Sequence, residues 1–345
     1  MRAFDYASPA KKEEVVALLG KSWGEVEVLA GGSDLLSLMK DEITTPRRLV
    51  NIKGIQELHG ISETPDALRI GALTTLAEIA ANEKVKQSYP VMAMAAGEAA
   101  SPQIRNVATL GGNLCQRPRC WYFRTGHGLL AQHDGKSLVL EGDNRYHAIL
   151  GNNGPAYFVS PSTVAPVLIA YDAIVSLLSP RGIRELPLEK FFIIPMEEGE
   201  REHNLQPDEI VTGVSLLGKK PASGQLRAGH YEIRQKEAFD WPYATAAVSL
   251  IMNASTVQRA KIVMGHVAPV PWLATEAAQT LLGKAITPAT AEEAAQTAVA
   301  KAKSLGHNTQ KIHLARVAVK RAILAAAGSS PHAAVGRNGA KGGAA

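Results

Sequence analysis

The chain has 345 residues, enough for about two domains at roughly 150 residues each. A net charge of only +5, without long single-sign tracts, argues against a nucleic-acid-binding protein. Its two cysteines, Cys115 and Cys120, exclude a disulfide framework and cannot alone complete a four-thiolate metal site. The N-terminus lacks the apolar run of a signal peptide, and no stretch approaches the roughly 20 apolar residues of a membrane helix. We therefore expect a soluble protein without an export signal of its own.

The first part of the chain alternates short strand-like and helical segments. Ser8 and Pro9 predict a helix start, followed by an apolar stripe that ends at Gly20. Strands are expected at 26–29, 49–52 and 67–71, with a helical turn at 35–39. Thr74 and Thr75 predict the cap of a helix through residue 79, and a further helix is expected from 91 to 100. This alternation predicts an α/β region.

Residues 114–157, called the excursion below, are rich in Gly, Asn and His and predict a long, partly ordered loop of functional or interfacial use. A polar Gly/Pro-containing segment at 218–224 predicts a linker. After it, strands are expected at 244–252 and 261–267, and Ala-rich helices at 274–283, 289–304 and 309–327. Strands followed by helices predict a smaller α+β domain. We therefore divide the chain into domains 1–220 and 225–328, with a disordered tail at 329–345.

Residues 29–34, Leu-Ala-Gly-Gly-Ser-Asp, join a predicted strand to a predicted helical turn. Paired glycines after a strand let the backbone turn tightly with its N–H groups exposed, and such a nest suits a pyrophosphate. Ser33 can add a hydroxyl donor. The segment is neither a Walker loop nor the Gly-x-Gly-x-x-Gly dinucleotide fingerprint. Taken alone, an ordinary strand-to-helix turn explains it about equally well.

A second glycine pair lies in residues 109–113, Thr-Leu-Gly-Gly-Asn, which follow Ser-Pro-Gln-Ile-Arg-Asn at 101–106. Two such loops could grip one diphosphate from both sides. Arg105 could neutralise phosphate charge, and it could equally pair with a carboxylate on the surface.

A third segment, residues 231–243, combines Lys236, Asp240 and several aromatic side chains ahead of an apolar strand. Seen alone, it is typical of aromatic core packing. His59, His230 and His266 are interpreted as structural, because nothing in the sequence joins them to a nucleophile or an acid.

In this order and spacing, the three segments resemble the flavoprotein subunits of the xanthine dehydrogenase and carbon monoxide dehydrogenase family of molybdenum hydroxylases. The resemblance runs from residue 4 to about 327. It includes Ile-Gly-Ala-Leu-Thr-Thr at 70–75, Pro-Ser at 161–162, Gly-His-Val-Ala-Pro at 265–269 and Pro-Trp at 271–272. Arg-Cys-Trp-Tyr-Phe-Arg at 119–124 is similar to the aldehyde-oxidising branch, whose bacterial members have three subunits. Each motif is modestly specific, whereas the ordered set is highly specific.

The resemblance implies an α+β fold class, in which an FAD-binding fold of two α/β subdomains precedes a smaller α+β C-terminal domain. It implies that the two glycine pairs contact the FAD diphosphate. Ser162 would then lie near the nucleotide portion, and Lys236 and Asp240 near the flavin. The candidate FAD-binding residues are Leu29, Ala30, Gly31, Gly32, Ser33, Asp34, Arg105, Asn106, Thr109, Gly111, Gly112, Asn113, Ser162, Lys236 and Asp240.

One departure from the family pattern concerns the nucleotide. Many relatives have Asp after the Pro-Ser pair, whereas this chain has Thr163, which puts a carboxylate-to-ribose hydrogen bond in doubt.

A second departure concerns metal. The excursion resembles an insertion that carries a 4Fe-4S cluster on four cysteines in some relatives, but here it holds only Cys115 and Cys120. His127, His133 and His147 could in principle complete a site. Their spacing differs from that of usual ligands, so we interpret them as ordinary surface histidines beside free cysteines and expect no metal in this chain.

The resemblance also implies a division of labour between subunits. Substrate, an aldehyde or an N-heterocycle, is oxidised at the molybdenum cofactor of one partner subunit. Electrons pass through 2Fe-2S clusters of a second partner to the FAD of this chain, and then to an external acceptor, for which NAD, a quinone, ferredoxin and oxygen stay open. This chain then contributes no catalytic residue to substrate oxidation. We expect a heterotrimer or its dimer, in the cytoplasm or co-exported to the periplasm with a partner.

Two alternatives stay open at this stage. A self-contained FAD oxidoreductase acting on a small substrate at its own flavin needs an acid/base pair near the flavin and a cap domain. A scaffold subunit with a vacant nucleotide site is the other alternative, and Thr163 is the feature that favours it.

Overall fold

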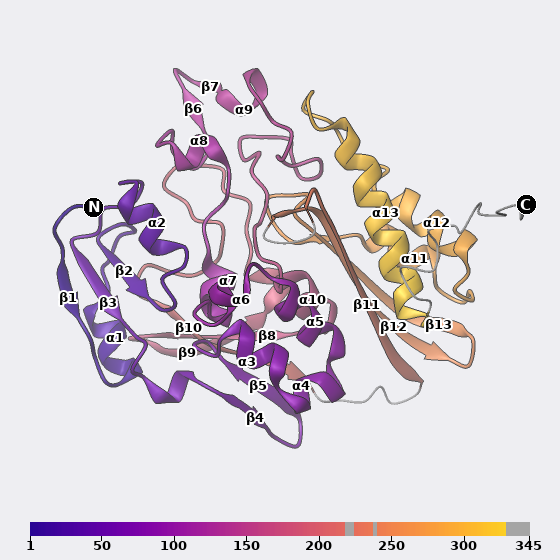
Figure 1. Ribbon diagram of the computed structural model, residues 1–345, viewed down its shortest axis with the longest axis horizontal. Helices are drawn as coiled ribbons and strands as arrows, with labels where there is room; N and C mark the ends of the chain where they lie inside the picture. The colour runs from indigo at the N-terminus through magenta and orange to yellow at the C-terminus, as the bar shows by residue number, and fades with distance from the viewer. Residues whose placement is uncertain (218–223, 237–239, 329–345) are drawn as a thin grey trace, which may run out of the picture.

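The computed structural model describes residues 1–217, 224–236 and 240–328. Three β-sheets follow one another along the longest axis, with the N-terminus at one end and the C-terminal helices at the other (Figure 1). The predicted tail at 329–345 lies outside the described residues, and so does the predicted linker except for Gly224. No helix in the described ranges is long and apolar enough to cross a membrane.

The N-terminal unit is a parallel three-stranded sheet of order β1-β3-β2, accompanied by two helices. Its elements are β1 (Asp5–Ala7), α1 (Lys12–Leu18), β2 (Val26–Leu29), α2 (Leu35–Lys40), β3 (Arg48–Asn51) and a 3-10 helix (Gln56–Leu58). The predicted start of α1 at Ser8 and Pro9 is wrong. The Glu14 carboxylate accepts hydrogen bonds from the backbone N–H groups of Ala10 and Lys11, at 3.0 and 3.3 Å, so the helix is capped three residues later.

A five-stranded sheet of order β4-β5-β10-β8-β9 forms the middle of the molecule, and all its pairs are antiparallel. Its strands are β4 (Ile61–Glu63), β5 (Ala67–Gly71), β8 (Ile174–Ser179), β9 (Gly182–Pro187) and β10 (Ile210–Leu217). Its helices are α3 (Leu76–Ala81), α4 (Glu83–Ser88), α5 (Pro90–Glu98), α6 (Pro102–Arg105), α7 (Leu110–Cys115), α10 (Ala165–Ala170) and a 3-10 helix (Leu188–Lys190). Apolar side chains of α3, α5 and α10 form one core with β5, β8 and β10. Thr75 caps α3 as predicted, since its side chain accepts the Glu78 N–H.

The excursion crosses the top of Figure 1 between the first and third sheets. It contains α8 (Trp121–Arg124), β6 (Gln132–His133), β7 (Lys136–Ser137) and α9 (Leu138–Glu141). Phe123, Val139 and Phe158 form a small core with Leu38 of α2. Later in the excursion, the backbone N–H groups of Ile149 and Leu150 donate to the Val267 carbonyl at 2.8 and 3.0 Å. The excursion therefore ties the N-terminal unit to the C-terminal unit.

The C-terminal unit is an antiparallel four-stranded sheet of order β11-β12-β13-β14 with three helices after it. Its elements are β11 (Gln225–Arg234), β12 (Pro242–Asn253), β13 (Thr256–Gly265), β14 (Trp272–Leu273), α11 (Thr275–Thr280), α12 (Pro288–Ala298) and α13 (Thr309–Ala326). The predicted order of strands and then helices is confirmed, although β11 is not among the predicted strands. A Cβ on Gly229 of β11 would lie 2.1 Å from the Ala322 carbonyl oxygen, so this glycine lets α13 lie directly on the strand.

Candidate cofactor site

A cavity of roughly 470 Å³ lies where the first sheet, the second sheet and the start of β12 meet. This volume is in the range of about 300–1,000 Å³ that ligand pockets usually have. Its wall includes both predicted glycine loops and residues 240–242, which are far apart in the sequence.

The first glycine loop offers unpaired backbone donors to this cavity. Among the described residues, the N–H groups of Gly31, Gly32, Ser33 and Asp34 have no hydrogen-bond acceptor, and all four residues line the cavity. Gly32 has a φ of +78°, a conformation that glycine adopts without strain. Successive unpaired N–H groups in such a turn form a concave site for an anion.

The two glycine loops touch each other through Gly31. A Cβ on this residue would lie 2.0 Å from the Val107 carbonyl oxygen, far closer than any real contact. Gly31 is therefore required by the packing of one loop against the other. The contact also closes this side of the cavity, because Ala108 and Thr109 lie on its wall.

The second glycine loop differs from the first in its backbone hydrogen bonding. The N–H groups of Leu110, Gly111 and Gly112 already bind acceptors within the chain, at 2.9, 2.8 and 3.2 Å. This loop therefore presents side chains to the cavity. Among them, the Asn113 side-chain carbonyl accepts a hydrogen bond of 2.7 Å from the Ser162 hydroxyl.

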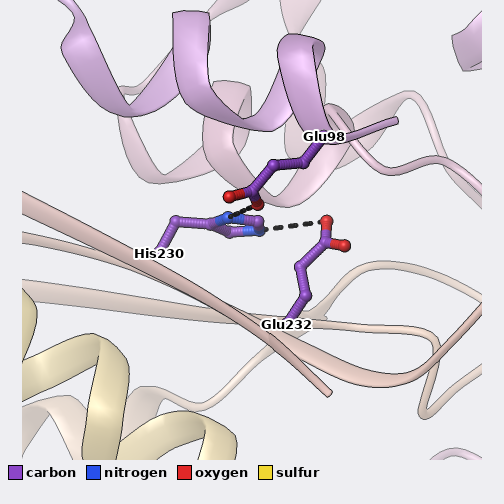
Figure 2. Close-up of side chains that lie close together, drawn as sticks. All are labelled: Glu98, His230 and Glu232. Atoms are coloured by element: carbon purple, nitrogen blue, oxygen red, sulfur yellow. Dashed lines mark ion pairs between the residues drawn. The ribbon is translucent and has the colours of Figure 1, made fainter. Parts of the chain in front are cut away.

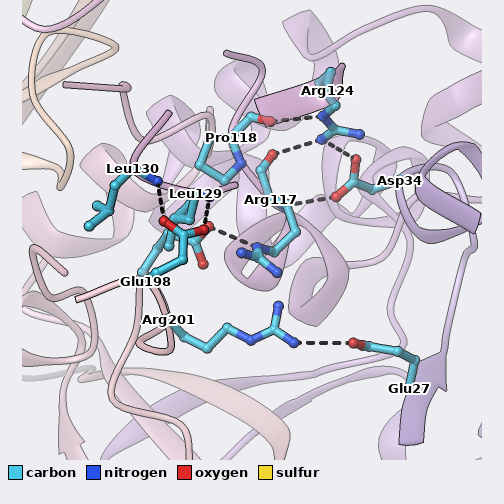
Figure 3. A network of polar contacts seen from close by, with 10 residues as sticks. Glu27, Asp34, Arg117, Pro118, Arg124, Leu129, Leu130, Glu198 and Arg201 are labelled. Atoms are coloured by element: carbon cyan, nitrogen blue, oxygen red, sulfur yellow. Dashed lines mark hydrogen bonds and ion pairs between the residues drawn. The ribbon is translucent and has the colours of Figure 1, made fainter. Parts of the chain in front are cut away.

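Three arginines of the excursion bind Asp34, and Figure 3 shows two of them, Arg117 and Arg124. The backbone N–H of Arg117 binds one carboxylate oxygen at 2.8 Å, and the guanidinium groups of Arg119 and Arg124 bind the other, each at 2.8 Å. These contacts neutralise a carboxylate that would otherwise repel an anion in the cavity. They also fix the start of the excursion to the first glycine loop.

Two further ion pairs lie at the cavity wall and connect residues 201–202 with the excursion and with β2 (Figure 3). The Arg117 guanidinium binds Glu202 at 2.8 Å, and Arg201 binds Glu27 at 3.2 Å. The Arg201 guanidinium also lies 4.6 Å from the ring centre of Trp23. Burial raises the pKa of Glu27 to about 7, although the positive charge of Arg117 opposes the shift.

Asp240 and Trp241, which precede β12, also line the cavity. Trp241 is 41% exposed and lies under the Arg119 guanidinium, 4.6 Å from ring centre to cation. The interpretation of this segment as aromatic core is therefore wrong for Trp241. The Asp240 carboxylate accepts the Lys236 N–H at 3.2 Å, and residues 237–239 lie outside the described part of the chain.

Ten of the fifteen candidate residues lie on the cavity wall, namely Ala30, Gly31, Gly32, Ser33, Asp34, Thr109, Gly111, Gly112, Asn113 and Asp240. Leu29, Arg105, Asn106, Ser162 and Lys236 are not among the residues that line it. The Arg105 guanidinium donates to the carbonyls of Ala99 and Ala100 at 2.9 and 2.8 Å, and its contact with phosphate stays a prediction. Since Ala99 and Ala100 line the cavity, Arg105 supports its wall from behind.

The cysteines and histidines of the excursion are distributed differently from the prediction. His147 is buried, not on the surface, and its Nε2 lies 3.2 Å from the Cys120 sulfur. Burial lowers the pKa of His147 to about 4 and raises that of the Cys120 thiol. Cys115 is partly buried, and desolvation raises its pKa to about 12, whereas His127 and His133 are exposed. Burial thus disfavours the thiolate, the form that binds metals, at both cysteines.

Sequence reasoning missed most of the charged wall. Arg117 and Arg119 follow the second glycine pair closely, and their proximity to a predicted diphosphate loop is a signal that could have identified them. His230, Glu232 and Arg234 alternate along β11 and so share one face of the strand, which is also readable from sequence.

Comparison with known proteins places this geometry in a family. The model of the FAD binding domain in molybdopterin dehydrogenase matches residues 2–216, and that of the CO dehydrogenase flavoprotein C-terminal domain matches residues 229–326. The chain belongs to the flavoprotein family of the molybdenum hydroxylases. This confirms the predicted family and the predicted order of an FAD-binding fold and a smaller C-terminal domain.

Similar proteins cover nearly the whole chain. The aldehyde oxidoreductase FAD-binding subunit PaoB of Escherichia coli (strain K12) is 33% identical over 323 residues, which are 92% of this chain and 96% of the relative. The carbon monoxide dehydrogenase medium chain of Hydrogenophaga pseudoflava is 30% identical, over 94% of this chain and 96% of the relative. A solved structure of carbon monoxide dehydrogenase from Hydrogenophaga pseudoflava, lacking the Mo-pyranopterin moiety of its cofactor, superposes with a TM-score of 0.74 at 27% identity. The superposition covers 95% of this chain and 98% of that chain.

Proposed function

We propose that this chain binds FAD in the cavity between residues 30–34 and 109–113 and serves as the electron-relaying subunit of a molybdenum hydroxylase complex. The observation that carries the proposal is the set of unpaired N–H groups from Gly31 to Asp34 on the cavity wall, beside arginine side chains. These donors suit the two negative charges of a diphosphate. Membership of the flavoprotein family supports the same cofactor.

The ten wall residues are assigned direct contact with FAD, and the five others support that wall. The N–H groups of Gly31, Gly32 and Ser33 donate to the diphosphate, while the Asp34 carboxylate is neutralised by its arginines. The end with Asp240 and Trp241 holds the flavin ring, and the end with Trp23 and residues 205–211 holds the nucleotide. Thr163 also lines the cavity, so its hydroxyl takes the place of the carboxylate that many relatives offer to the ribose.

When bound, the flavin supplies the chemistry of accepting electrons one at a time and passing on one or two. This chain holds and orients it, and substrate is oxidised on a molybdenum-cofactor subunit that passes electrons through 2Fe-2S clusters of another subunit. PaoB is named as an aldehyde oxidoreductase subunit, which supports an aldehyde as the substrate of the complex. We also propose the domain division 1–220 and 225–328, an external electron acceptor, and a location in the cytoplasm or, by co-export, the periplasm.

Cofactor analysis of the purified chain and of the complex that copurifies with it tests this proposal. We expect flavin in the isolated chain, and iron and molybdenum only in the complex. Adding an aldehyde such as benzaldehyde without oxygen should bleach the flavin absorbance in the complex and leave that of the isolated chain unchanged. Reduction of the flavin in the isolated chain would instead favour a self-contained oxidoreductase.

A further inference from the structure

Three titratable side chains, from Glu98, His230 and Glu232, lie close together without hydrogen bonds to one another (Figure 2). Glu98 ends α5, and His230 and Glu232 share one face of β11. His230 Nδ1 lies 3.8 Å from a Glu98 oxygen, and His230 Nε2 lies 3.7 Å from Glu232 Oε1. Side-chain exposure is 45% for Glu98, 0% for His230 and 3% for Glu232, so the imidazole separates an accessible carboxyl group from a buried one.

The Glu98–His230–Glu232 cluster contains buried polar atoms without hydrogen-bond partners. Within the described residues, both ring nitrogens and Glu232 Oε1 are buried without a hydrogen-bond partner. A neutral imidazole carries one N–H, so it can donate to only one of the two carboxylates, and its other nitrogen turns a lone pair toward the second. One additional proton, on either carboxyl group or on the ring, gives every contact a donor and an acceptor.

Arg234 holds the cluster in this arrangement. Its Nε donates to Glu232 Oε2 at 2.8 Å, and its Nη2 donates to the Glu98 carbonyl oxygen at 2.9 Å. The guanidinium therefore turns Glu232 Oε1 toward the ring and ties β11 to the end of α5. Its positive charge also stabilises the buried Glu232 carboxylate.

These contacts favour a proton over a metal ion. The two carboxylates face opposite nitrogens of the ring, with the ring between them, whereas a metal ion needs several ligand atoms directed at one point (Figure 2). Burial raises the pKa of Glu98 and Glu232 and lowers that of His230 to about 4, and the nearby His266 is buried with its pKa lowered to about 3.

We propose that Glu98, His230 and Glu232 form a proton relay that carries protons between the accessible Glu98 carboxyl group on the cavity wall and the buried Glu232 carboxyl group. The proposal rests on the proposed function, because Glu98 and Glu232 line the same cavity as Asp240 and Trp241, where we place the flavin. Reduction of a flavin by two electrons draws at least one proton to the ring, and its oxidation releases that proton.

The relay moves one proton in each direction per cycle. The Glu98 carboxyl group gives its proton to His230 Nδ1 as Nε2–H gives its proton to Glu232 Oε1, and Glu98 regains a proton from solvent. Glu232 then delivers its proton into the cavity. Oxidation of the flavin reverses these steps, so the imidazole returns to its starting tautomer and no proton is gained or lost over the cycle. Contacts of 3.7 and 3.8 Å must shorten by roughly 1 Å for transfer, a tightening common when a site binds its ligand.

Rapid photochemical reduction of the flavin in the full chain, with a pH-indicator dye in solution, measures the rate of proton uptake. We expect His230→Gln and Glu98→Gln to slow proton uptake by about 100-fold while FAD content and the oxidised flavin spectrum stay unchanged. His313→Gln is the matched control, because this histidine is exposed on α13. Proton uptake at the wild-type rate in both cluster variants would overturn the proposal. So would binding of one Zn²⁺ per chain that His230→Gln abolishes, since the cluster would then be a metal site.

FAD content is measured first, so that failure of cofactor binding is distinguishable from failure of the relay. Glu98 is half-exposed, so Glu98→Gln keeps the test decisive if His230→Gln does not fold. The cluster itself is also tested without cofactor, by following the His230 ring with NMR from pH 3 to 9. A relay requires coupled titration, so Glu98→Gln should displace the His230 titration curve. An unchanged curve would contradict the proposal whether or not FAD binds.

Discussion

Replacing Gly31 by alanine tests whether contact between the two glycine loops shapes the FAD cavity. The new Cβ would lie 2.0 Å from the Val107 carbonyl oxygen and 2.9 Å from its carbon. Because both atoms belong to the backbone, a loop must move by at least about 1 Å, and overpacking of this kind costs about 1–3 kcal/mol. If that cost falls on the FAD-binding conformation, the Kd for FAD should rise about 5- to 140-fold, at about 1.4 kcal/mol for each tenfold change.

Fluorescence titration of the cofactor-depleted chain with FAD measures this effect, with thermal unfolding recorded in parallel to detect loss of the fold. Gly54→Ala is the matched control, because nothing lies within 4 Å of the position its Cβ would take. A Gly31→Ala chain that binds FAD with the wild-type Kd would refute the idea that this contact sets the shape of the site.

Three further predictions concern charged groups around and beyond the cavity. Asp34→Ala removes the carboxylate shared by Arg119 and Arg124 and should lower the free energy of unfolding by about 2–4 kcal/mol in chemical denaturation, so an unchanged midpoint would contradict it. Burial raises the pKa of Glu27 from 4.5 to about 7, so the native chain binds more protons than the unfolded chain between these values. The free energy of unfolding should therefore fall as pH rises from 4.5 to about 7. In Glu27→Gln this fall should be smaller, and an equal pH dependence in both chains would contradict the prediction. Burial lowers the pKa of Lys311 from 10.5 to about 7, so the unfolded chain binds more protons there and stability should rise with pH across that range. Thermal unfolding of Lys311→Met should lack this rise, and its persistence would exclude Lys311 as the cause.

Elements with strong local signals could be predicted from the sequence. The strand at 67–71 and the capping of α3 by Thr75 follow from β-branched and hydroxyl residues at the right positions. Strand β11 was not predicted, because one of its faces carries His230, Glu232 and Arg234 and the strand packs on α13 through a glycine. These polar residues and the glycine interrupt the apolar alternation by which a strand is recognised in a sequence. The antiparallel pairing of the second sheet depends on contacts between distant segments, which alternation of elements does not encode.

In the site, too, local features could be predicted from the sequence and contacts between distant residues could not. The glycine loops were identified because the conformational requirement of Gly32 is local. The ion pair between Arg201 and Glu27 joins residues 174 positions apart, so it exists only once the fold brings them together. The bonds of Arg105 to the carbonyls of Ala99 and Ala100 could not be read from the sequence either, because they depend on how the backbone folds before the second loop.

The most direct test of FAD binding is the flavin content of the purified 345-residue chain, measured by absorbance after the cofactor is released by denaturation. The unpaired N–H groups of residues 31–34 and the neutralised Asp34 predict one FAD per chain, retained through purification or regained on reconstitution. A colourless, folded chain that takes up no FAD would contradict the assignment of this cavity.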